Sequence, residues 1–539
     1  MNRLHGGTMT LSPGGVGCNA NPKVTARVNL KRIFGLLPRS LRIGVSAILA
    51  VASDGPVYLL PSRICWHMLL AVWSRIAILR PLLTRKPMEL TFRQRIEHRL
   101  LTRLLGIPDG RYRRALARLD DQLKSSSNAE KSLLDSSRHG VMMMIGTLGP
   151  GGSERQLVVT AEGLHAKKGA SISVACVDLS LPANKYFVPE LEAAGIPVSV
   201  IGSEPGNLVT PQTRAMIDAL PFELRTVRAY ATTLAAMRPE IVHLWLDEVN
   251  VKGGIAAVLT GVQQIIISQR SLPPTNFGLH QPYMREVYRW LARKPGVKMI
   301  NNSAAGARGY EIWLGLPQGT IGVIRNGYAF DDRELLRYRA AQGEYRRRAA
   351  IPSTTLVVGA VMRLTEEKRP LLWLEIAAHV RQTLREVHFV IVGDGPMRSV
   401  MEERASRSDL AGSVHFTGIL KNAMCAVTDM DLLLLASRAE GLPNVLIEAQ
   451  FLGVPVVAPP VGGVPEAIYH GKSGWLLRGS DPKSYAHQIV RLLQDEQWRN
   501  AAIRHGPEFA FARFGMQRAI DETLAVYGGT MTGAKVSDH

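Results

Sequence analysis

The stretch Ser437–Ala449, SRAEGLPNVLIEA, decides the fold because it joins an apolar strand to a helix. It continues the run Asp431–Ser437 (DLLLLAS), and the pattern predicts a helix that begins at Asn444. Backbone N–H groups at a helix N-terminus are unpaired and carry partial positive charge. A helix that opens at the carboxyl end of a strand is therefore a ready phosphate-binding element of a parallel α/β sheet.

Apolar strands and helical patterns alternate on both sides of this stretch. Upstream, Val141–Ile145 (VMMMI) is followed by a glycine-rich turn and a helical pattern from Ser153, and the alternation continues to about residue 270. It restarts near Thr354. Such alternation is typical of parallel sheets covered by helices on both faces. We therefore expect an α/β protein with two doubly wound, Rossmann-like domains that face each other across a cleft, where ligands bind at the carboxyl ends of the strands.

These patterns predict four segments. They are a basic, partly apolar and mostly helical extension (1–135), an N-terminal Rossmann-like acceptor domain (136–330), a C-terminal Rossmann-like donor domain (331–505) and a C-terminal helix and tail (506–539).

The positive charge is concentrated in the extension. Residues 1–135 hold 22 Lys and Arg against 8 Asp and Glu, which is +14 of the net +20 of the chain. Nucleic acid, an anionic membrane surface or solubility alone could each explain such a segment. Because the charges are interleaved with apolar runs and no nucleic-acid-binding module accompanies them, we favour peripheral contact with an anionic membrane and expect no nucleic-acid partner.

Two apolar runs in the extension bear on membrane attachment. Asp54 and Pro56 interrupt Ile43–Pro61, and Arg75, Arg80 and Pro81 interrupt Cys65–Leu83. A charge near the bilayer centre costs about 3 kcal/mol. We expect helices on the membrane surface or ordinary core helices, and no membrane span.

The cysteines and the first residues bear on location. Four cysteines lie far apart without CxxC spacing, and no signal peptide is visible, which together predict a cytoplasmic protein without a structural zinc site.

Glu440 and Glu448 are the first candidate site residues. Glu440 precedes the predicted helix and Glu448 lies just over one turn inside it, so the two carboxylates project to different parts of an extended ligand. By spacing alone, solvated carboxylates on a helix face are the favoured explanation.

Further motifs along most of the chain support a functional role for Glu440 and Glu448. In order they are GGSER (151–155), RPEIVHLW (238–245), VIRNG (323–327), GAVMRLTEEK (359–368), VGDGP (392–396), VHFTG (414–418), SRAEGLPNVLIEA (437–449), GVPVVAPPVGGVPE (453–466) and GKSGWLL (471–477). Each is weak alone, but in this order they make residues 139–527 resemble glycosyltransferase family 4, the retaining group 1 glycosyltransferases of the GT-B fold, and in particular members that act in bacterial polysaccharide biosynthesis.

The resemblance implies roles for individual residues. Glu448 would accept hydrogen bonds from the ribose of a nucleotide sugar, Glu440 would contact hydroxyls of the donor sugar, and Arg363 and Lys368 would bind its diphosphate. Two cations suit a leaving group on which negative charge grows. The other expected donor contacts are Gly151, Gly152, Gly441, Leu442, Pro443 and Asn444 around the diphosphate, and Phe416 and Thr417 beside the base.

His243 is the remaining catalytic candidate. Family members often have a His-x-His pattern here, whereas this chain has Trp245 in the second position, so His243 is either a catalytic residue or a core histidine. Acceptor-side alternatives are Asp247, Glu248, Asn250 and Arg270, and Glu466 is expected to shape a loop.

The resemblance implies a retaining transfer from a UDP- or GDP-linked sugar, with no metal or further cofactor, to a saccharide or polyprenyl-linked saccharide in exopolysaccharide or cell-envelope synthesis. The expected place is the inner face of a bacterial plasma membrane. The alternatives are a non-catalytic subunit that binds sugar nucleotides, and another GT-B enzyme such as a sugar-nucleotide epimerase.

Overall fold

The structure of the protein is a computed structural model that describes residues 110–125, 140–168, 171–276, 280–330, 332–420, 422–479 and 481–528. The apolar runs at 43–61 and 65–83, and most of the predicted basic extension, lie outside the described residues. Within the described residues no helix has the length and apolarity needed to cross a membrane.

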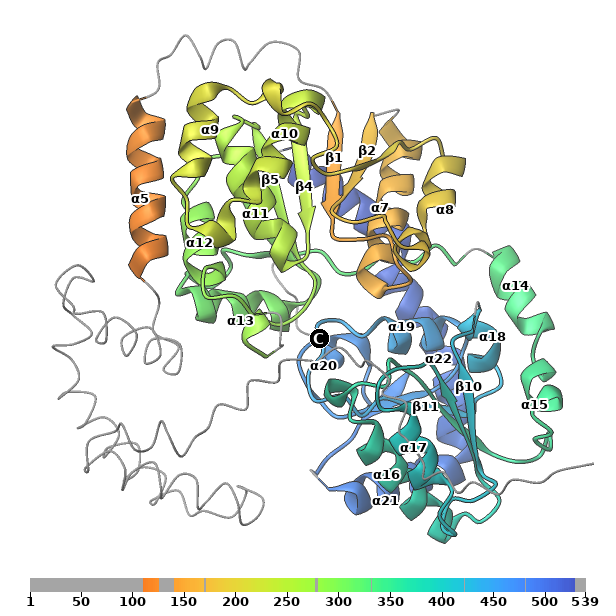
Figure 1. The fold of residues 1–539 in the computed structure, drawn as a ribbon. Helices are drawn as coiled ribbons and strands as arrows, with labels where there is room; N and C mark the ends of the chain where they lie inside the picture. Colours follow the sequence, from red (N-terminus) through yellow and green to blue (C-terminus); the bar gives the residue numbers. More distant parts are fainter. Residues whose placement is uncertain are drawn as a thin grey trace, which may run out of the picture. The chain divides into compact units, whose positions relative to one another are not determined.

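The first sheet has seven parallel strands in the order β3-β2-β1-β4-β5-β6-β7 (Figure 1). Its strands are β1 Val141–Ile145, β2 Ile172–Cys176, β3 Val198–Val200, β4 Ile241–Trp245, β5 Gln264–Gln269, β6 Val297–Asn301 and β7 Gly322–Val323. Its helices are α7 Gly152–Lys168, α8 Val188–Ala193, α9 Pro211–Asp218, α10 Val227–Met237, α11 Asp247–Leu259, α12 Met284–Leu291 and α13 Ala304–Leu314. Every residue of β1 is buried, as a central strand covered on both faces requires.

The second sheet has six parallel strands in the order β10-β9-β8-β11-β12-β13. They are β8 Val357–Val361, β9 His388–Val392, β10 Val414–Gly418, β11 Leu432–Leu434, β12 Val456–Ala458 and β13 Gly474–Leu476. The helices with them are η7 Glu366–Lys368, α16 Pro370–Thr383, α17 Arg398–Ala405, α18 Ala423–Val427, α19 Asn444–Phe451, α20 Val464–Ala467 and α21 Pro482–Gln494. The two doubly wound sheets confirm the predicted α/β fold class.

Each sheet reverses its strand order at the strand that begins it. In the first sheet Val141 of β1 pairs with Ile172 of β2 on one side and with Ile241 of β4 on the other. In the second, β8 lies between β9 and β11. Loops diverge at such a switch point and leave a crevice at the carboxyl ends of the strands.

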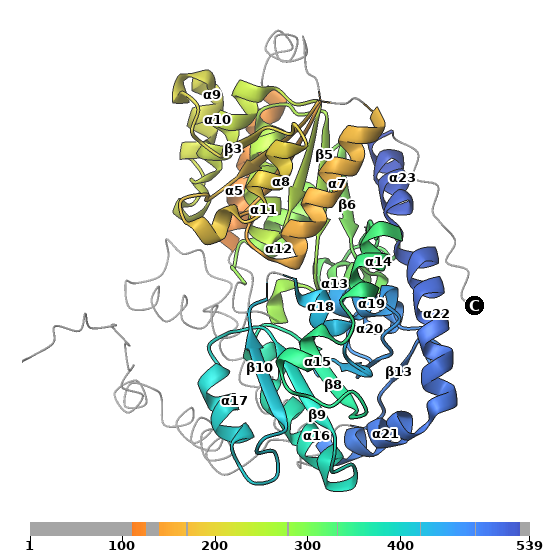
Figure 2. The same cartoon turned by 90° about the vertical axis from the view of Figure 1, so that its right-hand side faces the viewer.

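The chain crosses between the sheets twice. Helices α14 Asp332–Ala340 and α15 Glu344–Arg348 lie in the first connection. Near the C-terminus, α22 Glu496–Phe514 packs on α19, and α23 Met516–Tyr527 returns to pack on α7 (Figure 2). The linker residue Tyr328 bonds both ends of this return, through its N–H to Phe514 O at 2.9 Å and through its carbonyl to Met516 N at 3.0 Å. The predicted boundary after residue 505 falls inside α22, and the four-segment division stays a prediction.

Helix α5 Gly110–Ser125 is the described part of the predicted extension. Tyr112, Leu116 and Leu119 are buried, and the helix packs on α12. Asp120 accepts a 2.8 Å hydrogen bond from Trp290 Nε1. The apolar face of α5 is therefore covered by protein, and its arginine-rich face is exposed.

Candidate functional site

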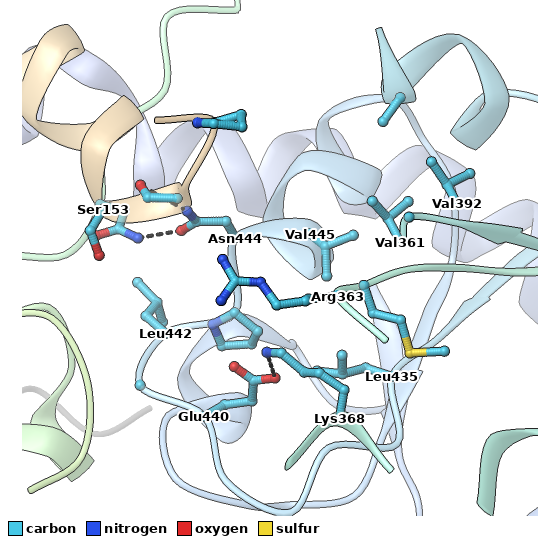
Figure 3. Close-up of a pocket in the computed structure, with 18 of the residues that line it drawn as sticks. Ser153, Val361, Arg363, Lys368, Val392, Leu435, Glu440, Leu442, Asn444 and Val445 are labelled. Carbon is cyan, nitrogen blue, oxygen red and sulfur yellow. Dashed lines mark hydrogen bonds and ion pairs between the residues drawn. The ribbon is translucent and has the colours of Figure 1, made fainter. Parts of the chain in front are cut away.

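A cavity of about 560 Å³ opens between the carboxyl ends of the two sheets (Figure 3). Eight of the residues predicted from the sequence line it: Gly152, Arg363, Lys368, Glu440, Gly441, Leu442, Pro443 and Asn444. They come from α7, the loop after β8, η7 and the β11–α19 turn. The structure thus brings together residues that lie up to 292 positions apart in the chain.

Arg363 is the exposed cation of this cavity. It follows β8, and within the described residues its side chain makes no hydrogen bond or ion pair. Figure 3 shows it extended between Asn444 and the pair formed by Lys368 and Glu440. Helix α19 begins at Asn444, and helix α7 of the facing domain begins at Gly152. A guanidinium that lines one cavity together with two helix N-termini is an arrangement suited to a diphosphate.

Lys368 and Glu440 form an ion pair on the same wall. Lys368 Nζ lies 2.6 Å from Glu440 Oε1, and Glu440 is 9% exposed. The carboxylate therefore fixes the ammonium group beside Arg363. The pair presents an anion and a cation to one ligand, which suits a sugar diphosphate.

Asn444 ties the helix N-terminus to the facing domain. Its Oδ1 accepts a hydrogen bond from Tyr328 OH at 2.7 Å and another from Asn326 Nδ2, and its Nδ2 donates to Gly152 O at 3.4 Å. A Cβ on residue 152 would lie 2.6 Å from Asn444 Nδ2, so only glycine permits this approach. Gly151 precedes this contact and does not line the cavity.

Glu448 does not line the cavity. It is 5% exposed on α19 and forms an ion pair with Arg155 of α7. Arg155 and Glu448 both lie in motifs found in the sequence, but nothing in the sequence predicted that these residues, 293 positions apart, would pair. A ribose could reach the Glu448 carboxylate only if Arg155 moved or shared it.

Phe416 and Thr417 also lie outside the cavity. Phe416 packs against the core between the second sheet and helices such as α16 and α21, and Thr417 lines a separate hollow with Cys425. The apolar end of the cavity is formed instead by Val361, Met362, Val392, Gly393, Ile419, Leu420 and Ala423. These residues lie at the ends of β8, β9 and β10 or just after them, except Ala423, which begins α18, and sequence analysis assigned them no role.

His243 is a buried residue of the N-terminal core. It is 1% exposed, and its Nδ1 lies 2.8 Å from Tyr527 OH of α23. The ring lies 5.0 Å from that of Trp245. Its Nε2 has no hydrogen-bond partner, and the residue lines a hollow of about 10 Å³ but not the cavity that holds Arg363. This position supports the core interpretation rather than the catalytic one.

Burial makes His243 a source of pH-dependent stability. Burial, together with the positive charge of Arg270, lowers its pKa from 6.5 to about 3. The unfolded chain therefore binds the proton more readily, and the stability present above about pH 6.5 is lost as the pH falls towards 3. We expect the melting temperature of the His243→Gln variant to fall less than that of the wild type between pH 7 and 4. An equal fall in the melting temperatures of the two proteins between pH 7 and 4 would contradict this assignment.

Among the alternatives on the acceptor side, only Arg270 lines the cavity. Asp247 accepts hydrogen bonds from Tyr288 OH and Tyr310 OH, and burial raises its pKa. Asn250 donates to Ser268 O at 3.0 Å. Asp247 and Asn250 are thus engaged in packing of the N-terminal domain.

Glu466 makes contacts between the two domains that the sequence did not predict. It belongs to α20 of the second domain, yet its carboxylate accepts hydrogen bonds of 3.0 Å from both Ala304 N and Ala305 N at the start of α13 in the first. Arg325 Nη2 donates to it at 2.9 Å. In the same loop Gly463 N donates to Glu440 O at 3.2 Å. Glu466 therefore joins the two domains beside the site.

We expect Glu466→Gln to weaken this junction. The variant loses the charge and one acceptor oxygen, which should lower the free energy of unfolding by about 1–3 kcal/mol. Urea unfolding measures the loss, with Glu402→Gln on the exposed face of α17 as the control. Equal stability of the two variants would show that the junction contributes nothing.

Metal binding has no support from the described residues, which contain no group of three or more His, Cys, Asp or Glu side chains suited to hold an ion.

Comparison with known proteins identifies the second domain first. Residues 354–495 match the sequence profile of the family described as glycosyl transferases group 1. The Vi polysaccharide biosynthesis protein VipC/TviE of Salmonella typhi is 28% identical over 405 residues, which cover 70% of this chain and 69% of that protein. The 2-deoxystreptamine glucosyltransferase of Streptomyces kanamyceticus is 30% identical over 256 residues, 46% of this chain and 64% of that protein. The aligned part is thus about two thirds of either relative.

Solved structures show the same fold. Anabaena Alr3699/HepE, crystallised with UDP and glucose, superposes with a TM-score of 0.59 at 21% identity, covering 73% of this chain and 100% of that chain. WaaG, a glycosyltransferase involved in lipopolysaccharide biosynthesis, gives 0.53 at 15% identity, with 72% and 100% coverage. With the cavity between two doubly wound sheets, these findings confirm that the chain resembles the group 1 glycosyltransferases of family 4 and that it has the GT-B fold.

Proposed function

We propose that the protein transfers a sugar from a nucleotide diphospho-sugar, with retention of configuration, to a hydroxyl of a saccharide acceptor. The observation that carries this proposal is the unpaired Arg363 in a cavity between two helix N-termini. The diphosphate lies among Arg363, Lys368 and the first backbone N–H groups of α19 and α7.

The rest of the donor follows from this placement. The apolar end of the cavity, near Val361 and Leu420, receives the base, and the sugar lies towards Glu440 and Gly441. A uridine base is supported by the Anabaena structures, which are described in complex with UDP and with UDP-glucose. Glu448 binds the ribose after Arg155 yields.

Transfer breaks the bond between the anomeric carbon and the diphosphate oxygen and forms a bond from that carbon to the acceptor oxygen. Negative charge grows on the leaving diphosphate, where Arg363 and Lys368 stabilise it. Glu440 is held by Lys368 and serves the sugar hydroxyls. We infer a front-face reaction in which the leaving phosphate takes the acceptor proton.

For the acceptor we propose a lipid-linked saccharide of polysaccharide or cell-envelope synthesis, reached from the cytoplasmic face of a bacterial membrane. The similarity to a Vi polysaccharide biosynthesis protein supports the polysaccharide. The charge of residues 1–135 supports attraction to an anionic leaflet. Since α5 is packed on α12, membrane attachment is tested by deleting residues 1–109 and keeping the helix. Unchanged sedimentation with membranes would defeat this part of the proposal.

The donor is tested by thermal shift with UDP-, GDP- and ADP-sugars, since a ligand that binds only the folded state raises the melting temperature. We expect a shift with a UDP-sugar that disappears in Arg363→Met. NMR of the product then assigns its anomer, and an inverted linkage would refute retention.

A further inference from the structure

Arg270 lies on the wall of the cavity that the N-terminal domain supplies. It follows β5, and its guanidinium carbon lies 4.4 Å from the centre of a Trp245 ring. Nη2 donates to Asn326 Oδ1, and Nη1 lies 3.4 Å from Ser268 Oγ. Nε is buried without a partner. The guanidinium is thus held in one orientation by neutral groups.

Within the described residues Arg270 has no carboxylate partner, unlike most cations around the cleft. The compensated cations and their partners are Arg155 with Glu448, Lys368 with Glu440, and Arg325 with Glu466. Arg363 also forms no ion pair, although Glu154 and Glu367 lie within electrostatic reach of it, and the diphosphate of the proposed donor accounts for its charge. Arg270 remains as a positive charge without an explanation.

This charge is costly in its surroundings. Burial lowers the pKa of Arg270 to about 9, because the charged form loses its water. A neutral side chain of similar length would cover Trp245 without that penalty. An anionic ligand in the cavity would compensate the charge.

The neighbouring Asn302 offers a second free group. It is 3% exposed and lines the cavity, and its Nδ2 donates to Arg270 O at 3.1 Å, while its Oδ1 has no partner. This wall faces the turn that follows Glu440, because a Cβ on Gly441 would lie 2.7 Å from Ser271 Cα and 2.9 Å from Arg270 O. Arg363 and Lys368, in contrast, come from the C-terminal domain.

We propose that Arg270 and Asn302 form a subsite for a sugar that bears a carboxylate. The planar guanidinium binds the carboxylate, and Asn302 Oδ1 accepts a hydrogen bond from a sugar hydroxyl. The proposal rests on the proposed function, in which the cavity holds a nucleotide sugar. The carboxylated sugar is either the one transferred or the one that accepts it, and the chemistry of recognition is the same.

The test compares wild type, Arg270→Met and Arg270→Lys, with Arg118→Met on the exposed face of α5 as the matched control. Calorimetry measures the affinity for UDP, UDP-glucose and UDP-glucuronate. Transfer assays compare the KM for galacturonate and galactose oligosaccharides. In one of these two measurements, we expect wild type and control to favour the carboxylated compound over the neutral one by about 10- to 100-fold. Arg270→Met loses that preference, whereas Arg270→Lys keeps part of it, and all four proteins bind UDP alike.

The measurement in which the preference occurs shows which sugar carries the carboxylate. A preference among donors places the carboxylate on the transferred sugar, and one among oligosaccharides places it on the acceptor. Two results overturn the subsite: no preference of the wild type in either arm, or a loss of UDP affinity in Arg270→Met as large as in Arg363→Met, which would make Arg270 a diphosphate ligand. Failure of folded wild type to bind UDP at all would instead refute the uridine donor of the proposed function.

Discussion

Replacing Arg363 with methionine is expected to lower kcat/KM for sugar transfer about 100- to 1000-fold, the usual loss when one preorganised group that stabilises transition-state charge is removed. Arg363 makes no hydrogen bond or ion pair within the described residues, so its removal leaves no buried carboxylate unpaired. The melting temperature should therefore stay near that of the wild type. Release of the nucleoside diphosphate measures the rate.

Arg381→Met is the matched control for this experiment. Arg381 lies on α16 and its Nη1 donates to Asp409 O at 3.1 Å, away from the cavity. The control should retain full activity. If the rate of the Arg363→Met variant lay within threefold of the control, the proposed binding of the diphosphate by Arg363 would be contradicted.

Glu440→Gln is expected to lower kcat by a similar factor, about 100-fold or more, with little effect on the affinity for UDP. The amide keeps the shape of the side chain but loses the charge that holds Lys368 at 2.6 Å. The sugar then loses a charged acceptor for its hydroxyls, while the freed ammonium group remains beside the diphosphate. Rates and UDP affinity are measured on the same preparations.

The control for Glu440→Gln is Glu402→Gln, because Glu402 forms an exposed ion pair with Arg398 on α17. An equal loss of UDP affinity and of kcat in Glu440→Gln would mean that Glu440 only positions Lys368. A loss confined to kcat assigns it to the transferred sugar.

The fold was predictable because its signals are local. The run Val141–Ile145 and the glycine turn before Ser153 specify a buried strand and a helix without help from distant residues. Strand order is not local, so the place of β1 between β2 and β4 came only from the structure. Local signals also overstate length: of the apolar run Asp431–Ser437, only Leu432–Leu434 forms the strand, and the residues after Leu434 lead towards the site.

The site was predictable to the same extent. The residues around Glu440 and Arg363 lie in motifs at strand ends, and topology brings strand ends together. Contacts between distant segments left no pattern in the sequence. Examples are the hydrogen bonds of Glu466 to the start of α13 and the contact of His243 with Tyr527, 284 residues away. Phe416 was assigned to the base by family resemblance, but it lies within β10 and packs against the core of the second domain.

The central claim is that the cavity between the two sheets binds the diphosphate of a nucleotide sugar, and a crystal structure of the protein with UDP tests it most directly. The account predicts the diphosphate within hydrogen-bond distance of Arg363 and of the first N–H groups of α19, with the base against Val361 and Leu420. UDP bound outside this cavity, or a diphosphate that leaves Arg363 without a contact, would contradict it.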